Sequence, residues 1–524
     1  MASDYDVVIV GGGHNGLTSG IFLRDKGRRV LIVERADKIG GMASSGYMIP
    51  EAPQHLVHPC AGELLTIRGT GLIEELNLAK YGLRQAEYDP PYAYLHPDGR
   101  SIALFLDHLR TADDISRISK SDGQSYLKFM ELMTALREIG YPMVTNDPAK
   151  PRLKDLLKVI GALIRNRKLK SDLQVLAAGT ADQIACEYFE HPATIAFLTG
   201  LAAGAGPIDV DGGGAAYMLF AMLHRWGTGK PIGGMQKFSD ALAACYRERG
   251  GELRLNAPVQ EIVIQDGRAR GVRLQSGETI TADVVIATCD PHTMMKLATP
   301  GGIERRLVER MKHVPSAKEV APFVANIAMS KPISLKKHQS MRHDDADLNK
   351  AVGLIGLPED VRDTFIAARR GEISARPAIS VTPTSNCDPT QAPPGQSIAY
   401  VYLPAIVTDP RGGWTEELKR QTTDNVLRIV SEYYEGFDSE IGRFVETPRD
   451  REKRVNVTNG CVTHVDFASS RMRLNRPAPG LGGPAPIVPG LFIGGAGIHP
   501  GGGISGMAGK TAANRVHNYL KKNP

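Results

Sequence analysis

A glycine-rich turn near the start of the chain has residue types and a spacing that suit the binding of phosphates. Gly11, Gly13 and Gly16 form a G-x-G-x-x-G motif, and Glu34 follows at a distance of about twenty residues. The first glycine allows a tight turn, the second lets a pyrophosphate approach the backbone, and the third lets a helix pack closely on a strand. A carboxylate at this distance can accept hydrogen bonds from an adenosine ribose. The pattern predicts that this stretch binds the ADP moiety of a dinucleotide.

The sequence around the motif supplies the elements that such a turn requires. Residues 5–10 are apolar and uncharged after Asp6, which predicts a short buried strand. A helix pattern then runs to about Gly27, and residues 29–33 predict a second strand that ends at Glu34. The N–H groups and the dipole at the start of the helix favour bound phosphate. A glycine-rich turn that only packs is the alternative, and the complete order of strand, helix, strand and acid favours the binding site.

Two further glycine-rich stretches indicate which dinucleotide is bound. The pair Gly40-Gly41 resembles the extension by which FAD oxidoreductases bring backbone amides to the cofactor. Residues 491–494 predict a strand that leads into a glycine-rich turn and a helix from about Ser505. A nicotinamide dehydrogenase does not need this last half-site, whereas an extended FAD does. Residues 200–218 are also glycine-rich, but their flanks are helical and no acid follows, so we expect a packing or substrate-side loop and no NAD(P)H domain.

The remaining pattern predicts two kinds of sheet. Residues 251–288 read as three strands joined by turns, a β-meander beside the main sheet, and residues 282–291 contain the strand that returns to the nucleotide fold. Residues 323–330 and 397–404 alternate as antiparallel strands with one buried face. Residues 415–434 predict an amphipathic helix.

These motifs together resemble the phytoene desaturase-like superfamily of FAD oxidoreductases, which contains carotenoid desaturases and isomerases. Within it they resemble the branch of pyridine nucleotide-disulphide oxidoreductase domain-containing protein 2. The stretches that carry the resemblance are GGGHNGL (11–17), ERADKIGGMA (34–43), YGLR (81–84), GGM (233–235), GCVTHVDF (460–467) and GAGIHPGGGISGMAG (495–509). They extend over nearly the whole chain. Because no C-x-x-C is present, disulphide chemistry is not expected.

The resemblance implies an α/β fold: a discontinuous Rossmann-type FAD-binding domain and an α+β substrate domain that contains an antiparallel sheet and helices. Residues 1–90, 231–300 and 480–524 would build the FAD-binding domain. Residues 91–230, largely helical, and 301–479, with the sheet, would build the substrate domain. The implied FAD contacts are Gly11, Gly13, His14, Asn15, Gly16, Glu34, Arg35, Gly40, Gly41, Met42, Val259, Gly495, Ala496, Gly497, Gly503, Ile504 and Ser505. Many members of the superfamily have a basic residue at the position of Met42, so one contact would differ.

Histidines near the motifs are the candidates for catalysis. Because flavin N5 accepts a hydride directly from a C–H bond, the protein mainly supplies orientation and electrostatics, and we expect no catalytic triad. His499 lies in the last glycine-rich turn, and His58 follows the glycine pair, close to His55. His464 and Asp466 would share one side of a strand, which suits an acid–base pair. The alternative for each histidine is a structural hydrogen bond or a turn.

The leading hypothesis is therefore an FAD-dependent oxidoreductase that removes a hydride from a hydrophobic, isoprenoid- or carotenoid-like substrate. The flavin would be reoxidised by oxygen or a quinone, because no nicotinamide site is visible. Residues 205–222 are rich in small and apolar side chains, which suits a long, dry cavity. Two alternatives stay open. An amine oxidase-like enzyme would need an aromatic cage beside the flavin, and few paired aromatic residues are visible near the FAD motifs. The other is a flavoprotein with a mainly binding role.

Composition limits the other partners. A net charge of +6 is small for 524 residues, and no strip of basic and aromatic residues appears, so no nucleic acid is expected. Six scattered cysteines fit reduced thiols in the cytoplasm and no metal site. Met1–Tyr5 is too short and polar for a signal peptide. Residues 151–170 form a basic amphipathic helix, which suits either peripheral membrane contact or packing on the substrate domain. The sequence leaves the oligomeric state open, a homodimer included.

Overall fold

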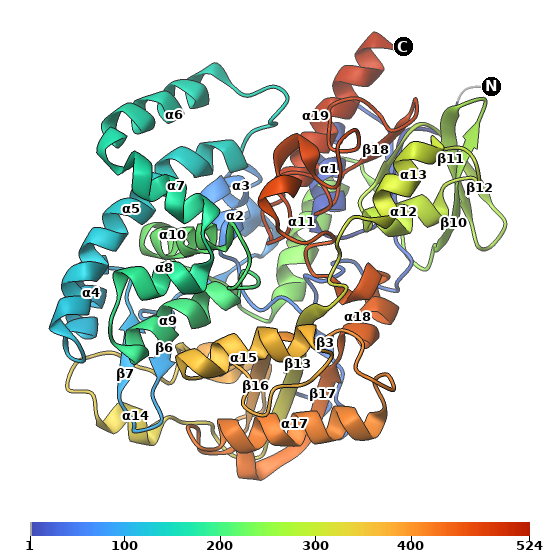
Figure 1. The fold of residues 1–524 in the computed structure, drawn as a ribbon. Helices are drawn as coiled ribbons and strands as arrows, with labels where there is room; N and C mark the ends of the chain where they lie inside the picture. Colours follow the sequence, from blue (N-terminus) through green and yellow to red (C-terminus); the bar gives the residue numbers. More distant parts are fainter. Residues whose placement is uncertain (1–2, 524) are drawn as a thin grey trace.

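The computed structural model describes residues 3–523, and its first layer is a sheet drawn from three distant parts of the chain (Figure 1). At its centre, β1 (Tyr5–Val10) pairs in parallel with β12 (Thr279–Ala287) and with β2 (Val30–Val33). Two short parallel strands extend it: β9 (Glu252–Arg254) lies beside β2, and β18 (Leu491–Ile493) lies beside β12. The first residues of β12 instead pair in antiparallel fashion with β11 (Arg268–Leu274), and β11 pairs in the same way with β10 (Val259–Gln265), which completes the meander.

Alternate side chains of β1 enter two different cores. Val7 and Ile9 lie in one core, and Val8 and Val10 lie in the other. A strand that is covered on both faces must be apolar at every position, which explains the unbroken apolar run in the sequence. The helices of the first core are α1 (His14–Arg24), α11 (Met235–Glu248) and α19 (Met507–Lys522). The second core also takes side chains from α12 (Pro291–Leu297) and α13 (Arg305–Lys312).

The second layer is a sheet in which only β14 and β6 run parallel to each other. Its strands, in spatial order, are β17 (Glu440–Glu446), β13 (Val320–Met329), β16 (Ser397–Val407), β15 (Ile379–Thr382), β14 (Val352–Ile355), β6 (Tyr92–Leu95) and β7 (Ser101–Leu104). It is accompanied by α15 (Pro358–Arg369) and α17 (Glu416–Val430), which lie on either side of it in Figure 1. Thr415 caps α17, because its side-chain oxygen accepts a hydrogen bond from the N–H of Leu418.

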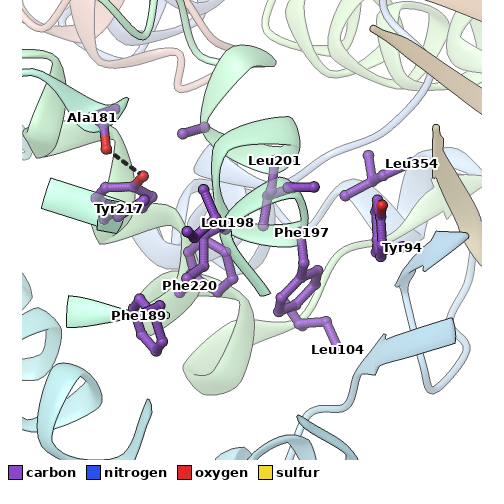
Figure 2. Close-up of a cluster of buried hydrophobic side chains, with 14 of the residues drawn as sticks. Tyr94, Leu104, Ala181, Phe189, Phe197, Leu198, Leu201, Tyr217, Phe220 and Leu354 are labelled. Carbon is purple, nitrogen blue, oxygen red and sulfur yellow. Dashed lines mark hydrogen bonds between the residues drawn. The ribbon is translucent and has the colours of Figure 1, made fainter. Parts of the chain in front are cut away.

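A helical layer packs against the second sheet on the same side as α15. Its members are α4 (His108–Ser116), α5 (Lys120–Val144), α6 (Leu153–Arg165), α7 (Lys170–Ala178), α8 (Ala181–Tyr188), α9 (Pro192–Ala203) and α10 (Met218–Trp226). Its core is aromatic: Figure 2 shows Phe189, Phe197 and Phe220 packed together with Tyr217. The Tyr217 hydroxyl donates to the carbonyl of Ala181 at 2.6 Å, so a buried polar group keeps a partner.

Short elements connect these layers. They are β3 (Gly46–Tyr47), β4 (Leu56–Val57), α2 (Thr66–Thr70), α3 (Leu72–Glu75), β5 (Gln85–Ala86), β8 (Lys230–Pro231), α14 (Lys336–Ser340), α16 (Thr384–Cys387) and α18 (Pro448–Val455). The predicted α/β class and the antiparallel sheet are confirmed. The boundaries predicted for the two domains stay a prediction. Within residues 3–523, no helix is both long and apolar enough to cross a membrane.

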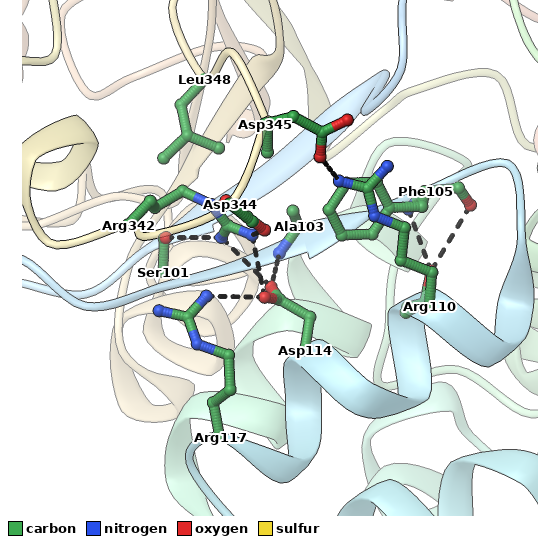
Figure 3. A network of polar contacts seen from close by, with 12 residues as sticks. Ser101, Ala103, Phe105, Arg110, Asp114, Arg117, Arg342, Asp344, Asp345 and Leu348 are labelled. Carbon is green, nitrogen blue, oxygen red and sulfur yellow. Dashed lines mark hydrogen bonds and ion pairs between the residues drawn. The ribbon is translucent and has the colours of Figure 1, made fainter.

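A buried ion pair joins the helical layer to a loop that connects strands of the second sheet (Figure 3). Asp114 on α4 and Arg342 are joined at 2.9 Å, and both side chains are almost wholly buried. The same carboxylate accepts a hydrogen bond from the backbone N–H of Ala103 at 2.6 Å and from Arg117 at 2.7 Å. Because the partners come from segments more than two hundred residues apart in the sequence, this pair fixes the position of β7 and α4 against the loop after α14.

We expect Asp114→Asn to lower the free energy of unfolding by about 3 kcal/mol, because the buried Arg342 then keeps only the half-buried Asp344 as an anionic partner. Asp345→Asn is the matched control: the Asp345 carboxylate pairs with Arg110 but is 82% exposed, so its loss should cost about 1 kcal/mol or less. Urea denaturation of both variants measures the difference. Equal losses would show that the buried pair does not hold the layers together.

Candidate cofactor-binding and active site

One cavity of about 1950 Å³ is lined by residues of both sheets and of the helical layer. The three stretches predicted to bind the cofactor all contribute to its wall, through Val10, Gly11 and residues 13–16 of the first, residues 39–44 of the second, and Ala496, Pro500 and residues 502–504 of the third. Residues 257–259, from the start of the meander, and 288–290, just after β12, also line it. The parallel pairing of β1, β2, β12 and β18 explains this convergence, because parallel strands bring their carboxyl ends to one edge of the sheet.

The first glycine-rich turn leaves open space where a phosphate would lie. Gly11 has a φ of +109°, and a Cβ on Gly16 would come within 2.0 Å of the carbonyl oxygen of Gly11. These two glycines are therefore required by the turn itself. Around Gly13, by contrast, the nearest atom to an added Cβ would be 4.0 Å away, at the carbonyl of Gly40. The first turn of α1 begins there, so N–H groups without helical partners lie beside this open space.

Glu34 stands at the end of β2, on the wall of the same cavity. One carboxylate oxygen accepts from the N–H of Gly12 at 2.7 Å, and the other accepts from the N–H of Ala36 at 2.9 Å. These bonds fix the carboxylate, and each oxygen keeps a lone pair that can accept a hydroxyl group. The carbonyl of Glu34 also accepts from Ala257, which brings the cavity-lining Val259 to the same end of the site.

The two later stretches are brought alongside the first. Gly40 pairs with Gly13 in a β-bridge and donates its N–H to the carbonyl of Gly12 at 3.0 Å. Gly40 and Gly41 both have positive φ values, and Met42 follows them on the cavity wall. The predicted contacts in the cavity wall are Gly11, Gly13, His14, Asn15, Gly16, Glu34, Arg35, Gly40, Gly41, Met42, Val259, Ala496, Gly503 and Ile504.

Three predicted contacts do not line the cavity. An added Cβ on Gly495 would meet the carbonyl of Thr288 at 2.3 Å, and one on Gly497 would meet the ring of Pro291 at 2.2 Å, so both glycines serve close packing. The Ser505 hydroxyl accepts from the N–H of Met507 at the start of α19. Arg35 lines the cavity, but its guanidinium donates to the carbonyl of Lys453 at 2.7 Å and to that of Arg454.

The histidines proposed for catalysis are placed differently from one another. His499 is 4% exposed, lies outside the cavity wall and bonds through Nε2 to the carbonyl of Met143 at 2.9 Å. His58 is also buried away from the cavity, with Nε2 at 3.0 Å from the side-chain oxygen of Gln391. His55 is buried too and does not line the cavity. Burial lowers the pKa of all three imidazoles.

His464 lines the cavity, but the strand predicted around it does not form. Its φ is +64°, so residues 461–466 make turns instead of an extended segment. Asp466 accepts from the N–H of Ala317 at 2.8 Å, so its carboxylate serves that loop. The expected acid–base arrangement of His464 and Asp466 on one strand face is therefore wrong.

His14 and His464 both line the cavity as neutral imidazoles. Burial, together with the nearby His464, lowers the pKa of His14 to about 4, and burial lowers that of His464 to about 4. Both rings are therefore uncharged at neutral pH. A neutral imidazole can donate from one ring nitrogen and accept at the other, so each ring can hydrogen-bond a bound molecule or accept a proton, which makes that ring cationic.

A polar cluster on the cavity wall escaped the sequence analysis. Tyr92 donates its hydroxyl to Glu63, and Lys230, only 3% exposed, lies 3.5 Å from the sulfur of Cys387. Tyr400 and Tyr402 stack with their ring centroids 6.2 Å apart and their planes at 15°. This aromatic pair lies on β16, outside the FAD motifs near which few paired aromatics were expected. The i, i+2 spacing of the two tyrosines on β16 was a usable signal, because such residues share one face of a strand.

Much of the remaining wall is apolar, although Arg369, Ser380 and Thr382 also line it. It includes Ala203, Met218, Leu219, Met222, Leu223, Val352, Leu354 and Phe365, from α9, α10, β14 and α15. The segment predicted to face the substrate, 205–222, contributes several of these side chains. One end of the cavity therefore offers backbone amides and a carboxylate, and the other offers a hydrocarbon surface.

Comparison with known proteins gives consistent relatives. The profile described as flavin containing amine oxidoreductase matches residues 16–517. Pyridine nucleotide-disulfide oxidoreductase domain-containing protein 2 of Mus musculus is 27% identical over 99% of this chain and 94% of its own length. Phytoene desaturase (neurosporene-forming) of Rhodobacter capsulatus is 27% identical over 96% of this chain and 91% of its own. The fold is similar to that of cyclohexylamine oxidase from Brevibacterium oxydans, with a TM-score of 0.59, 16% identity and coverage of 99% of this chain and 100% of that one.

The lowered pKa of His464 predicts a pH-dependent stability. Below pH 6.5 the imidazole of His464 binds a proton in the unfolded chain, whereas in the folded chain it binds one only near pH 4. The free energy of unfolding therefore falls as the pH falls through this window. His464→Asn removes one such proton, and asparagine tolerates a positive φ. We expect the slope between pH 6 and 4.5 to decrease by roughly 1 kcal/mol per pH unit.

Urea denaturation across this pH range, at fixed cofactor loading, measures the slope. His343→Gln, at an exposed histidine, is the control and should leave the slope as it is in the unmodified protein. An unchanged slope in His464→Asn would mean that His464 titrates normally.

Proposed function

Because the chain belongs to the flavin-containing amine oxidoreductase family and is an FAD-dependent oxidoreductase, we propose that it removes a hydride from a C–H bond of an extended apolar substrate. The observation that carries this proposal is the single cavity that reaches from the glycine-rich turns to a hydrocarbon wall. Such continuity is what a redox cofactor and an apolar substrate need in order to meet away from water.

The residues present fit an extended FAD. The open space beside Gly13 and the free N–H groups of α1 would receive the pyrophosphate, and Glu34 would accept from the adenosine ribose. The backbone at Val259 would reach the adenine. Residues 40–42 and 503–504 would hold the flavin side. Bound FAD supplies a hydride acceptor at flavin N5.

The apolar wall would orient the substrate. Side chains of α10, such as Leu219 and Met222, offer a surface without hydrogen-bonding groups, which suits an isoprenoid- or carotenoid-like chain. Hydride removal from such a chain leaves a carbocation, which becomes an alkene when the neighbouring carbon loses a proton, so the reaction needs orientation, exclusion of water and a proton acceptor. The uncharged imidazoles of His14 and His464 line the cavity and would accept that proton. Oxygen or a quinone would then reoxidise the cofactor.

The stacked tyrosines support a second candidate, oxidation of an amine. Tyr400 and Tyr402 lie on the cavity wall with Glu63 nearby, and aromatic faces together with a carboxylate can hold an ammonium group. A purely binding role is a third reading. Reduction of the flavin under anaerobic conditions by any substrate class would exclude that reading.

Gly13→Val should abolish FAD retention. The added side chain would fill the open space beside the first turn of α1, whereas the folded protein has room for it. Visible flavin absorbance per mole of purified protein measures the loss, and Gly483→Val, at a glycine with no atom within 4 Å of an added Cβ, is the matched control. A fully flavinylated Gly13→Val protein would refute this placement of the pyrophosphate.

The substrate class can be tested by anaerobic bleaching of the flavin with two panels, apolar isoprenoids and alkyl amines. We expect isoprenoids to reduce the flavin and Leu219→Glu to slow this at least tenfold, because it places a charge against the hydrocarbon chain. Glu63→Gln should leave that rate within about twofold, since the proposed reaction uses no ammonium partner. Reduction by amines alone, lost in Glu63→Gln, would replace this proposal with the second candidate.

A further inference from the structure

Helix α6 carries a row of large apolar side chains on the outside of the molecule. Its members are Leu153, Leu156, Leu157, Ile160, Leu163 and Ile164, hereafter the α6 face, and each is between 42% and 72% exposed. At roughly 100° per residue, these positions fall within an arc of about 120° on the helix surface. In Figure 1, α6 lies at the outer edge of the helical layer. Contiguous apolar exposure on this scale marks an interaction surface.

The inner side of α6 is the less apolar one. Asp155 and Ala162 are its buried residues, and Asp155 bonds to Asn146 and Arg152. Packing on the substrate domain therefore uses a small and a polar residue and leaves the leucines and isoleucines outside. The helix thus packs on α5, as one of the two alternatives expects, but its apolar stripe is not the side that packs.

Basic side chains accompany the α6 face. They are Lys154, Lys158, Arg165, Arg167, Lys168 and Lys170. Lys158 lies 3.7 Å from Asp155 and Arg165 lies 3.1 Å from Glu138, whereas Lys154, Lys168 and Lys170 have no carboxylate within 4 Å in residues 3–523. The surface is thus apolar in its centre and positive at its side, which is the complement of an anionic lipid bilayer.

We propose that α6 lies in the interface of an anionic lipid membrane, with the α6 face among the acyl chains and the lysines at the headgroups. A second copy of this chain fits less well, because a two-fold contact through this face would set equal basic flanks against each other. The placement also suits an apolar substrate. The cavity is lined by Tyr141 and Val144 of α5 and by Ala177 of α7, the two helices that flank α6 in the sequence.

Vesicle co-sedimentation of the full-length holoprotein tests this inference independently of the reaction. The protein should sediment with vesicles of phosphatidylglycerol and phosphatidylcholine and much less with phosphatidylcholine alone. Leu157→Glu combined with Ile160→Glu and Ile164→Glu should lower the partition coefficient at least tenfold. A second variant, Lys154→Gln with Lys168→Gln and Lys170→Gln, should weaken the binding and reduce its sensitivity to salt.

The matched control adds three glutamates at exposed apolar residues elsewhere, Tyr47, Met341 and Ile366, and should bind as the unmodified protein does. Retained flavin absorbance in each variant reports that the fold is intact. Equal sedimentation of the α6 variant and the control would overturn the proposal. Failure of the unmodified protein to bind anionic vesicles would also overturn it. If, in addition, the unmodified protein were a dimer and the α6 variant a monomer, the α6 face would instead be a contact between two copies of this chain.

Discussion

The parallel ladder between β1 and β12 is the constraint on which the rest of the site depends. Val7 faces Val284 and Val10 faces Ala287, so the chain leaves both strands at the same edge. Thr288 then donates its hydroxyl to the carbonyl of Val10 at 2.9 Å and closes the back of the first glycine turn. Without this register, the adenine end, the phosphate turn and the last glycine turn would lie on separate surfaces. The second sheet and the helices add a hydrocarbon wall to an edge that the ladder has already defined.

Local patterns predicted the elements that depend on neighbouring residues. The first glycine turn, the acid after β2 and the cap of α17 each follow from chemistry within a few positions, and the structure has them as expected. The hydrogen-bond partner of a buried histidine does not follow from neighbouring residues. His499 is held by Met143 and His58 by Gln391, more than three hundred residues away in both cases, and no local pattern reports such a partner. For the same reason Lys230 drew no attention, although it is almost fully buried in the cavity wall.

Helix α6 shows a different limit of sequence reasoning. Its periodicity predicts an amphipathic helix correctly, but periodicity does not say which stripe faces the protein. Here Asp155 finds hydrogen-bond partners on the inside, so a polar residue can be buried at little cost. The apolar residues are then left for a different environment. The same hydrophobic pattern would have been placed in a core had the inner surface been apolar.

One neighbour of β12 in the first sheet, β18, is synthesised late. The carboxyl-terminal half of β12 pairs with β1 on one side and with β18 on the other, and β18 begins only at Leu491, after every strand of the second sheet has been made. Until then one edge of β12 has unpaired N–H and C=O groups, and such edges recruit other chains. While the strands of the second sheet are being synthesised, that edge of β12 therefore lacks its partner strand. Pairing of β18 with β12 covers this edge, and it also brings the last glycine-rich turn, which follows β18, into the cavity wall.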